Sequence, residues 1–235
     1  MNDEKLSMRL EKVATFVRSG SVVADIGSDH AYLPIYLVKK GIVPRAIAGE
    51  VNEGPLSSAK EQIKYNDLNH VITAKLGNGL AVIQDESVNT VVIAGMGGPL
   101  IADILENGKP QLEGVERLIL QPNVAADHVR RWLFNNGWSL IDEAILDEGD
   151  HVYEILVAES GDAKESYSDD LEKELWMGPH LLRNKNSAFN KKWNREWNQL
   201  EKVYDQLKQA NDQKKLSKKT KDIQQKLSWL KEELS

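Results

Sequence analysis

Residues 22–32 of the chain read VVADIGSDHAY, and this stretch decides the fold. A short apolar run rich in valine and isoleucine is typical of a strand that is covered on both faces of its sheet. The run carries Asp25 near its end, and Gly27 allows the sharp turn from a strand into a helix. The first amides of such a helix are free to bind a polar ligand group. The stretch therefore predicts a strand, a tight turn and a helix, with a ligand site at the turn.

The same rhythm of strand and helix continues through residue 159. Strands are expected at 22–26, 45–51, 71–76, 88–94 and 117–121, and helices near 5–18, 32–40, 55–66, 100–107 and 124–135. This alternation predicts a parallel, doubly wound α/β sheet. Two further runs, 138–146 and 152–158, are separated by only DEGD and predict an antiparallel hairpin at the sheet edge. Five parallel strands followed by such a pair indicate a Rossmann-like class I methyltransferase fold.

The pattern changes after residue 159. Residues 160–170 are polar and predict a linker, and residues 171–235 have helical periodicity. Apolar residues spaced three, four and seven apart are typical of a coiled-coil seam; they stand at 189, 193, 197, 200, 204 and 207, and at 216, 223, 227, 230 and 234. We expect an antiparallel helical coiled-coil hairpin with its turn within 209–215, preceded by a short helix that Gly178-Pro179 interrupts. The expected domains are thus 1–159 and 171–235, and the first should fold without the second.

Composition excludes several classes of protein. The chain of 235 residues is 41% hydrophobic and 28% charged, which is typical of a soluble globular protein. It has no cysteine, which excludes a disulfide scaffold, a thiol nucleophile and a cysteine-ligated metal. No apolar run approaches the ~18 residues of a membrane span, and the charged N-terminus does not resemble a secretory signal. We expect a cytoplasmic protein, monomeric, with no metal and no membrane partner.

The charge is distributed unevenly along the chain. The net charge is −6, but residues 183–221 hold 12 basic and 4 acidic residues, whereas residues 1–159 hold 14 basic and 23 acidic ones. An acidic body with a basic helical tail indicates two modules with two tasks, and a basic tail is suited to a polyanion such as RNA. Trp193 and Trp197 could stack on bases, but their spacing of four favours the helical seam.

Polar or glycine-rich motifs follow the later strands in the same way as the first. Glu50 lies 25 residues after Asp25, close to the spacing at which a carboxylate meets a ribose diol, although a lone glutamate is more often a surface residue. The third, fourth and fifth strands are followed by Gly77-Asn78-Gly79, Gly95-Met96-Gly97-Gly98 and Gln121-Pro122-Asn123. Open α/β sheets bind ligands at these strand ends. The set predicts a cofactor that contains a nucleoside.

Three segments carry a resemblance to a known family. DIGSDHAYLP from Asp25 to Pro34, GMGG from Gly95 to Gly98 and LQPN from Leu120 to Asn123 resemble the bacterial tRNA (adenine(22)-N1)-methyltransferase family, and the resemblance extends over the whole chain. It implies S-adenosyl-L-methionine (SAM) as cofactor and N1 of adenosine 22 in the tRNA D-loop as methyl acceptor. The residues that would bind the cofactor are Asp25, Gly27, Ser28, Glu50, Val51, Gly77, Asn78, Gly79, Gly95 and Met96.

The chemistry of the methyl acceptor suggests a second set of site residues. Methylation of N1 leaves a cationic base, which a nearby carboxylate would stabilise. Asp29 is the candidate, with capping of the next helix as the competing role; His30 is a weaker one, because a packed histidine is the commoner case, and Asn123 could orient the base. The residues that would bind tRNA are Tyr32, Gly97, Pro122, Lys191, Lys192, Arg195, Lys214, Lys215, Lys218 and Lys219.

Two other functions fit part of the sequence. A methyltransferase of a small molecule would explain the strand-end motifs but gives the basic helices no role. A non-catalytic RNA-binding protein on the same fold would explain the tail, but it predicts a degraded cofactor site, whereas the strand-end motifs are all present.

Overall fold

A computed structural model describes residues 5–209 and 213–235, with side chains described except at 209 and 213–218. Its centre is a seven-stranded sheet with the order β3-β2-β1-β4-β5-β7-β6. The strands are β1 (Val22–Ile26), β2 (Arg45–Glu50), β3 (Ile72–Leu76), β4 (Thr90–Gly97), β5 (Arg117–Val124), β6 (Trp138–Glu148) and β7 (His151–Ser160). The first five are parallel, and β7 pairs antiparallel with both β5 and β6. The expected parallel sheet with an antiparallel edge hairpin is confirmed.

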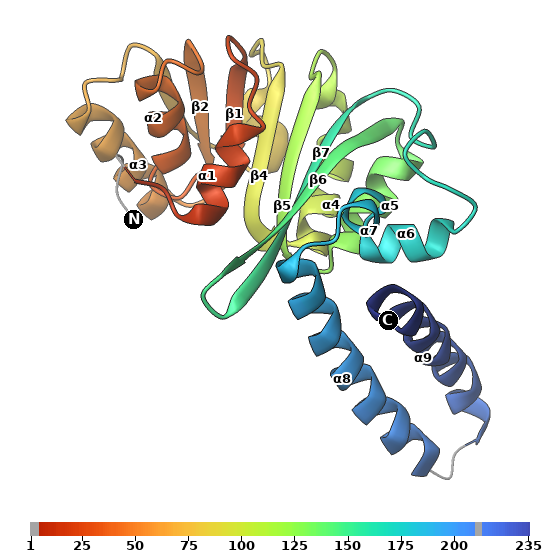
Figure 1. Cartoon of the computed structure of the whole chain (residues 1–235). Coiled ribbons are helices and arrows are strands. Elements are labelled where there is room, and N and C mark those ends of the chain that lie inside the picture. Colours follow the sequence, from red (N-terminus) through yellow and green to blue (C-terminus); the bar gives the residue numbers. More distant parts are fainter. Residues whose placement is uncertain (1–4, 210–212) are drawn as a thin grey trace.

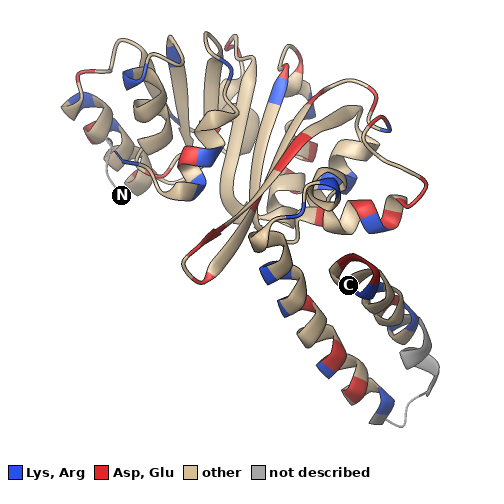
Figure 2. Ribbon diagram, in the orientation of Figure 1, with Lys and Arg blue, Asp and Glu red and all other residues tan. Residues whose placement is uncertain are grey.

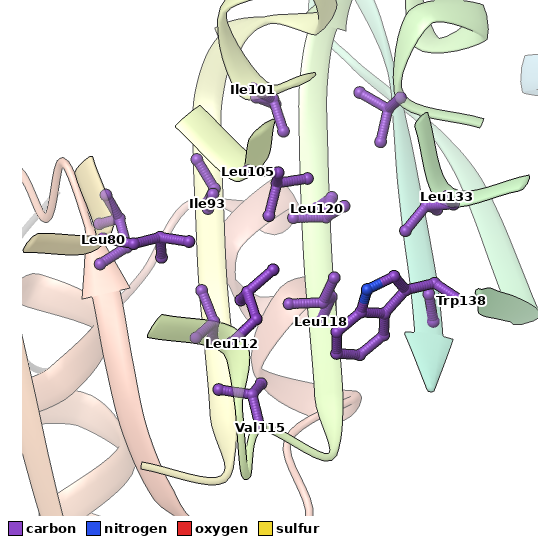
Figure 3. Close-up of a cluster of buried hydrophobic side chains, with 14 of the residues drawn as sticks. Leu80, Ile93, Ile101, Leu105, Leu112, Val115, Leu118, Leu120, Leu133 and Trp138 are labelled. Atoms are coloured by element: carbon purple, nitrogen blue, oxygen red, sulfur yellow. The ribbon is translucent and has the colours of Figure 1, made fainter. Parts of the chain in front are cut away.

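Helices cover both faces of the sheet (Figure 1). One face carries α1 (Met8–Thr15), α2 (Tyr32–Lys39) and α3 (Glu53–Tyr65). The other carries α4 (Gly98–Asn107), α5 (Ala126–Asn135) and the 3-10 turns η1 (Gly79–Ile83) and η2 (Lys109–Leu112). Figure 3 shows the core on this second face, where Ile93, Leu118 and Leu120 of the sheet meet Leu105 and Leu133 of the helices. Each such side chain contributes roughly 1.5–3 kcal/mol when it is fully buried.

The fourth and fifth strands run further than expected. Gly97 still pairs with Val124, after two shifts of register between β4 and β5. The helix expected from residue 124 therefore begins only at Ala126, after Ala125 with a φ of +55°. Gly98 fits closely against this turn, since a Cβ there would stand 1.9 Å from the carbonyl oxygen of Ala125. The glycine-rich end of β4 and the end of β5 are thus held together as one edge.

The C-terminal helices fall into two pairs, of which the first packs on the body and the second forms an arm. They are α6 (Leu171–Met177), α7 (Pro179–Arg183), α8 (Ser187–Gln209) and α9 (Gln213–Leu234), and α8 and α9 project from the sheet as a hairpin (Figure 1). Gly178 separates α6 from α7, as expected. Phe189, Trp193 and Leu230 are buried at the base of the hairpin, in one cluster with Ile145 of β6. The turn expected at 209–215 is shorter than predicted, because Gln209 still belongs to α8 and α9 already begins at Gln213; residues 210–212 lie outside the described part of the chain.

The segment expected to be a linker also packs on the body. Ala163 and Ser166 are buried, and the Ser166 hydroxyl donates a hydrogen bond to the carbonyl oxygen of Leu140. Arg183 donates to the carbonyl oxygen of Ser166 over 2.7 Å. These contacts extend the body to residue 183, and they argue against the expectation that residues 1–159 fold in the absence of the later helices.

A buried ion network ties the arm to the body. Arg130 of α5 is fully buried, and its guanidinium donates to Glu143 over 2.6 Å and to Glu154 over 2.5 Å. It also donates to the carbonyl oxygen of Trp176 in α6 over 3.2 Å, and Glu143 accepts from the amide of His180 in α7 over 3.0 Å. One arginine thus joins α5, β6 and β7 to the helices that carry the arm.

Replacing Arg130 with methionine is expected to lower the free energy of unfolding by about 3–5 kcal/mol, because it leaves two buried carboxylates without their counter-ion. Arg131→Met is the matched control. Arg131 pairs with Glu172, and both side chains are largely exposed, so its loss should change the stability by at most about 1 kcal/mol. Chemical denaturation measures both variants; an equal loss in the two would show that the buried network does not stabilise the fold.

Candidate functional site

The turn after β1 is locked by its own polar groups. The amides of Gly27 and Ser28 donate to the carbonyl oxygen of Gly49 over 2.9 and 3.1 Å, and Gly27 has a φ of +72° that favours glycine. The buried Asp25 carboxylate accepts a 2.7 Å hydrogen bond from the Ser28 hydroxyl. Burial raises the pKa of Asp25 to about 7, with a smaller contribution from the nearby Glu50. The ends of β1 and β2 therefore form one rigid edge.

The chain then makes a left-handed turn of three residues that are not glycine. Asp29, His30 and Ala31 have φ values of +39°, +60° and +58°. Such conformations are unfavourable and persist where the surroundings enforce them, often at functional sites. Here the amide of Asp29 donates to Glu50 over 2.8 Å. The sequence gives no sign of this turn, since glycine is its usual marker.

The turn presents Asp29 and His30 outward. The Asp29 side chain is 75% exposed, and its carboxylate lies 3.6 Å from the imidazole of His30. Ala31 is the N-cap of α2, and no side chain caps it, so the competing role of Asp29 as a helix cap is not observed. His30 is about half exposed, which differs from a histidine packed in the core, and its ring centroid lies 5.4 Å from that of Tyr32. These three side chains share one edge.

Glu50 and the loops beside it form the opposite part of the edge. The Glu50 side chain is buried, and burial raises its pKa. Its backbone carbonyl accepts from the amide of Gly77, which places the Gly77–Gly79 loop next to it. Val51 and Asn78 are exposed here, and Asn78 makes no capping bond to the 3-10 turn η1. A buried carboxylate flanked by an exposed apolar and an exposed amide side chain can hold a ribose and a base.

Gln121 and Asn123 shape the loop at the end of β4. The Gln121 side chain is fully buried and accepts from the amide of Gly95 over 2.9 Å. Asn123 donates to the carbonyl oxygen of Gly95 over 2.8 Å and accepts from Gln121 over 3.2 Å. Asn123 therefore fixes the path of Gly95-Met96-Gly97, and its amide group is already engaged there.

Arg9 is a residue of this edge that no sequence motif predicted. It lies on α1, and its guanidinium donates to Gln121, stands 3.6 Å from where a Cβ of Gly95 would be, and lies over the ring of Tyr153. Its charge also lowers the pKa of Asp25 somewhat, against the effect of burial. The signal is missing because only the docking of α1 on the sheet brings Arg9 beside residues more than 80 positions away.

Three basic residues expected to bind tRNA have partners within the protein. Lys191 pairs with Asp147 over 2.6 Å, Lys192 pairs with Glu154, and Arg195 donates to the carbonyl oxygen of Asp150 over 2.9 Å. These contacts hold α8 against the hairpin of β6 and β7. Lys219 is exposed, and the side chains of Lys214, Lys215 and Lys218 lie outside the described residues. Figure 2 shows both basic and acidic residues along α8, so its charge is more balanced than that of the whole 183–221 segment.

The described part of the chain holds neither a cluster of metal ligands nor a helix that could span a membrane. Within residues 5–209 and 213–235, no three histidine or acidic side chains come together in a way that could hold a metal ion. Over the same residues, no helix is long and apolar enough to cross a membrane.

Comparison with known proteins agrees with the geometry. The family model for tRNA (adenine(22)-N(1))-methyltransferase, TrmK, matches residues 23–232. The curated tRNA (adenine(22)-N(1))-methyltransferase of Bacillus subtilis strain 168 is 48% identical over 206 residues, which are 87% of each chain. The crystal structure of B. subtilis TrmK superimposes with a TM-score of 0.95 at 46% identity and covers 99% of this chain and 100% of that one. A Streptococcus pneumoniae relative solved with S-adenosyl-L-methionine has a TM-score of 0.87 at 41% identity, over 98% and 100% of the two chains. The chain therefore belongs to the tRNA (adenine(22)-N(1))-methyltransferase family.

Proposed function

We propose that this protein transfers the methyl group of SAM to N1 of adenosine 22 in tRNA. The observation that carries the proposal is the 48% identity to the B. subtilis enzyme over 87% of both chains. The residues at the strand ends support it. Glu50 is a buried carboxylate suited to a ribose, the turn at Gly27 offers backbone for a ligand to lie against, and Asp29 is an exposed carboxylate suited to the cationic product. A tRNA substrate also favours a cytoplasmic location, and we propose a monomer.

The residues at the ends of β1, β2 and β3 fit SAM. We propose that Glu50 accepts from the ribose hydroxyls, that Val51 and Asn78 contact the adenine, and that the chain at Gly27 and Ser28 lies against the methionine part. Gly77, Gly79, Gly95 and Met96 would complete the cradle, with Asp25 beneath it. Arg9, at the same end of the cradle, is suited to a carboxylate because its guanidinium is a charged, forked donor. When bound, SAM supplies an electrophilic methyl group.

Replacing Glu50 with alanine is expected to weaken SAM binding by about 10- to 150-fold, the equivalent of one hydrogen-bonding interaction with a charged group, roughly 1.5–3 kcal/mol. Glu53→Ala, an exposed change three residues further on, is the matched control and should bind SAM as the wild type does. Titration calorimetry measures both. Unchanged affinity in Glu50→Ala would remove the ribose assignment.

Methyl transfer to N1 requires correct positioning of the adenine more than it requires an acid or a base. N1 of adenine has its lone pair in the ring plane and is already a nucleophile, so the rate depends on holding it about 3 Å from the methyl carbon and in line with the bond that breaks. We propose that Asp29 lies beside the base and stabilises the positive charge that it gains. We propose that Tyr32 stacks on the base and that Gly97, Pro122 and Asn123 form the surface on which the base rests.

The arm gives tRNA a second place to bind. The N1 edge of a paired or stacked adenine is not accessible, and freeing it costs a few kcal/mol, which binding elsewhere must offset. We propose that lysines along the outer part of the arm neutralise phosphates. The pairing of Lys191, Lys192 and Arg195 within the protein makes the outer residues, Lys214, Lys215, Lys218 and Lys219 among them, the better candidates.

Incubation with unmodified tRNA and labelled SAM, followed by mass spectrometry of the nucleosides, tests this function. We expect label in N1-methyladenosine, and we expect a tRNA with guanosine at position 22 to remain unlabelled. Label in N6-methyladenosine, or turnover only of a small molecule, would contradict the proposal. SAM binding without any turnover would instead favour a non-catalytic RNA-binding protein.

A further inference from the structure

A cavity of about 300 Å³ lies between the body and the arm. Its walls come from the end of β5 and the start of α5, from the turn between β6 and β7, and from α8, with Asn123, His151, Val152, Arg195, Glu196 and Gln199 among the lining residues. It does not include Gly27, Glu50 or Asn78. The cavity is therefore separate from the proposed SAM cradle, and the catalytic body and the arm form it jointly.

The cavity begins beside the loop on which the target adenine would rest. Asn123 lines it and also donates to the carbonyl oxygen of Gly95. Because β5 is the neighbour of β4, and adjacent strands lie about 4.8 Å apart, the cavity starts one strand beyond the end of β4. An RNA chain that places one base over the end of β4 would bring an adjacent nucleotide to the cavity.

The charge of the lining favours a neutral group over a phosphate. Three carboxylates line the cavity, those of Asp150, Glu154 and Glu196, against the two cations Lys192 and Arg195. Lys192 is paired with Glu154, which compensates its charge, and burial lowers its pKa to about 7. A phosphate would meet a net negative lining, whereas the amino groups of a base would find acceptors there.

The remaining surfaces suit a planar ring. Val124 and Val152 provide apolar walls, and the imidazole of His151 is exposed at the rim. The side chain of Gln199 is exposed and makes no hydrogen bond to another residue in the described part of the chain. Proteins read single-stranded RNA by stacking unpaired bases on rings and bonding their edges to such amides. The volume is at the lower end for small-ligand pockets, which suits one base.

We propose that this cavity binds the base of a nucleotide next to the methylated adenosine. The inference rests on the proposed function, since it needs tRNA as the substrate. It gives the start of β7 and the middle of α8 a role in recognition: His151 and Gln199 hold the neighbouring nucleobase while the target adenine occupies the edge beside Asp29.

A binding cycle with the full-length protein tests the inference. The double variant His151→Ala/Gln199→Ala is expected to bind unmodified tRNA about 10-fold more weakly than the wild type, the loss of one stacking contact and one hydrogen bond, with SAM affinity unchanged. Asn198→Ala, an exposed change on the same helix outside the cavity lining, is the matched control and should bind as the wild type does. Two further tRNAs lack the base at position 21 and at position 23, respectively. On the one that lacks the base bound by the cavity, the double variant and the wild type should bind equally.

Three results would overturn the inference. The first is an equal loss of tRNA affinity in Asn198→Ala. The second is a full 10-fold loss in the double variant on both tRNAs that lack a neighbouring base. The third is a loss in the double variant that vanishes only on a tRNA that lacks the base at position 22 itself. The last would assign the cavity to the target adenine. These are binding measurements, so a failure of the inference can be told apart from a failure of the proposed function, which would appear as no N1-methyladenosine formed by the wild type.

Discussion

Replacing Asp29 with asparagine is expected to reduce the turnover of tRNA methylation by about 100-fold or more, with little change in the affinities for SAM and tRNA. The substitution removes the negative charge that would stabilise the cationic product and the transition state leading to it. It leaves the fold intact, because the Asp29 side chain is exposed, does not cap α2, and holds its left-handed φ of +39° in a region that asparagine also adopts. The amide that donates to Glu50 belongs to the backbone and remains.

A control with the same chemistry is available elsewhere in the chain. Asp67 is exposed and left-handed as well, with a φ of +56°, and lies between α3 and β3. Asp67→Asn should keep wild-type turnover. Single-turnover kinetics at saturating SAM and tRNA measure the chemical step in both variants. Normal turnover in Asp29→Asn would show that the carboxylate does not act on the base.

Removal of the outer arm should reduce kcat/KM for tRNA on the order of 100-fold or more, while SAM binding stays as in the wild type. Tyr204 and Gln224 face each other across the hairpin through a 2.5 Å hydrogen bond, so residues 203–225 can be replaced by a short glycine–serine loop without changing the helix register. The change keeps Phe189, Trp193 and Leu230 and the network around Arg130. It removes six lysines: Lys208, Lys214, Lys215, Lys218, Lys219 and Lys221.

The salt dependence of tRNA affinity distinguishes the contribution of the arm's charge to binding from that of its shape. The logarithm of tRNA affinity should fall steeply with the logarithm of salt concentration, by about 0.7–0.9 for each phosphate that the protein neutralises. Changing Lys214, Lys215, Lys218 and Lys219 to glutamate should flatten that slope, whereas changing them to arginine should preserve it. If the shortened protein methylates tRNA as the whole protein does, the arm is not the binding element.

The sequence by itself determined the sheet and most of the strand-end positions. Strand β1 has the bounds that its apolar run predicted, and the edge hairpin of β6 and β7 lies where the short DEGD connection placed it. These features depend on local periodicity and turn residues, which neighbouring positions carry. For the same reason the hairpin of α8 and α9 could be predicted from the spacing of its apolar residues, and the position of Glu50 at the end of β2 from its distance to Asp25.

Only the tertiary structure decided which side chains meet. Arg9 lies beside Gln121 because α1 docks on the sheet, and Arg130 meets Glu143, Glu154 and the carbonyl of Trp176 through four different elements. The sequence predicted that Lys191 and Lys192 bind tRNA, but in the structure they pair with carboxylates about 40 positions away. Asp29 and His30 face outward through a left-handed turn that the hydrogen bond to Glu50 supports. Such pairings join residues that are distant in the chain, and no local pattern encodes them, because the contact energy exists only once the elements have packed.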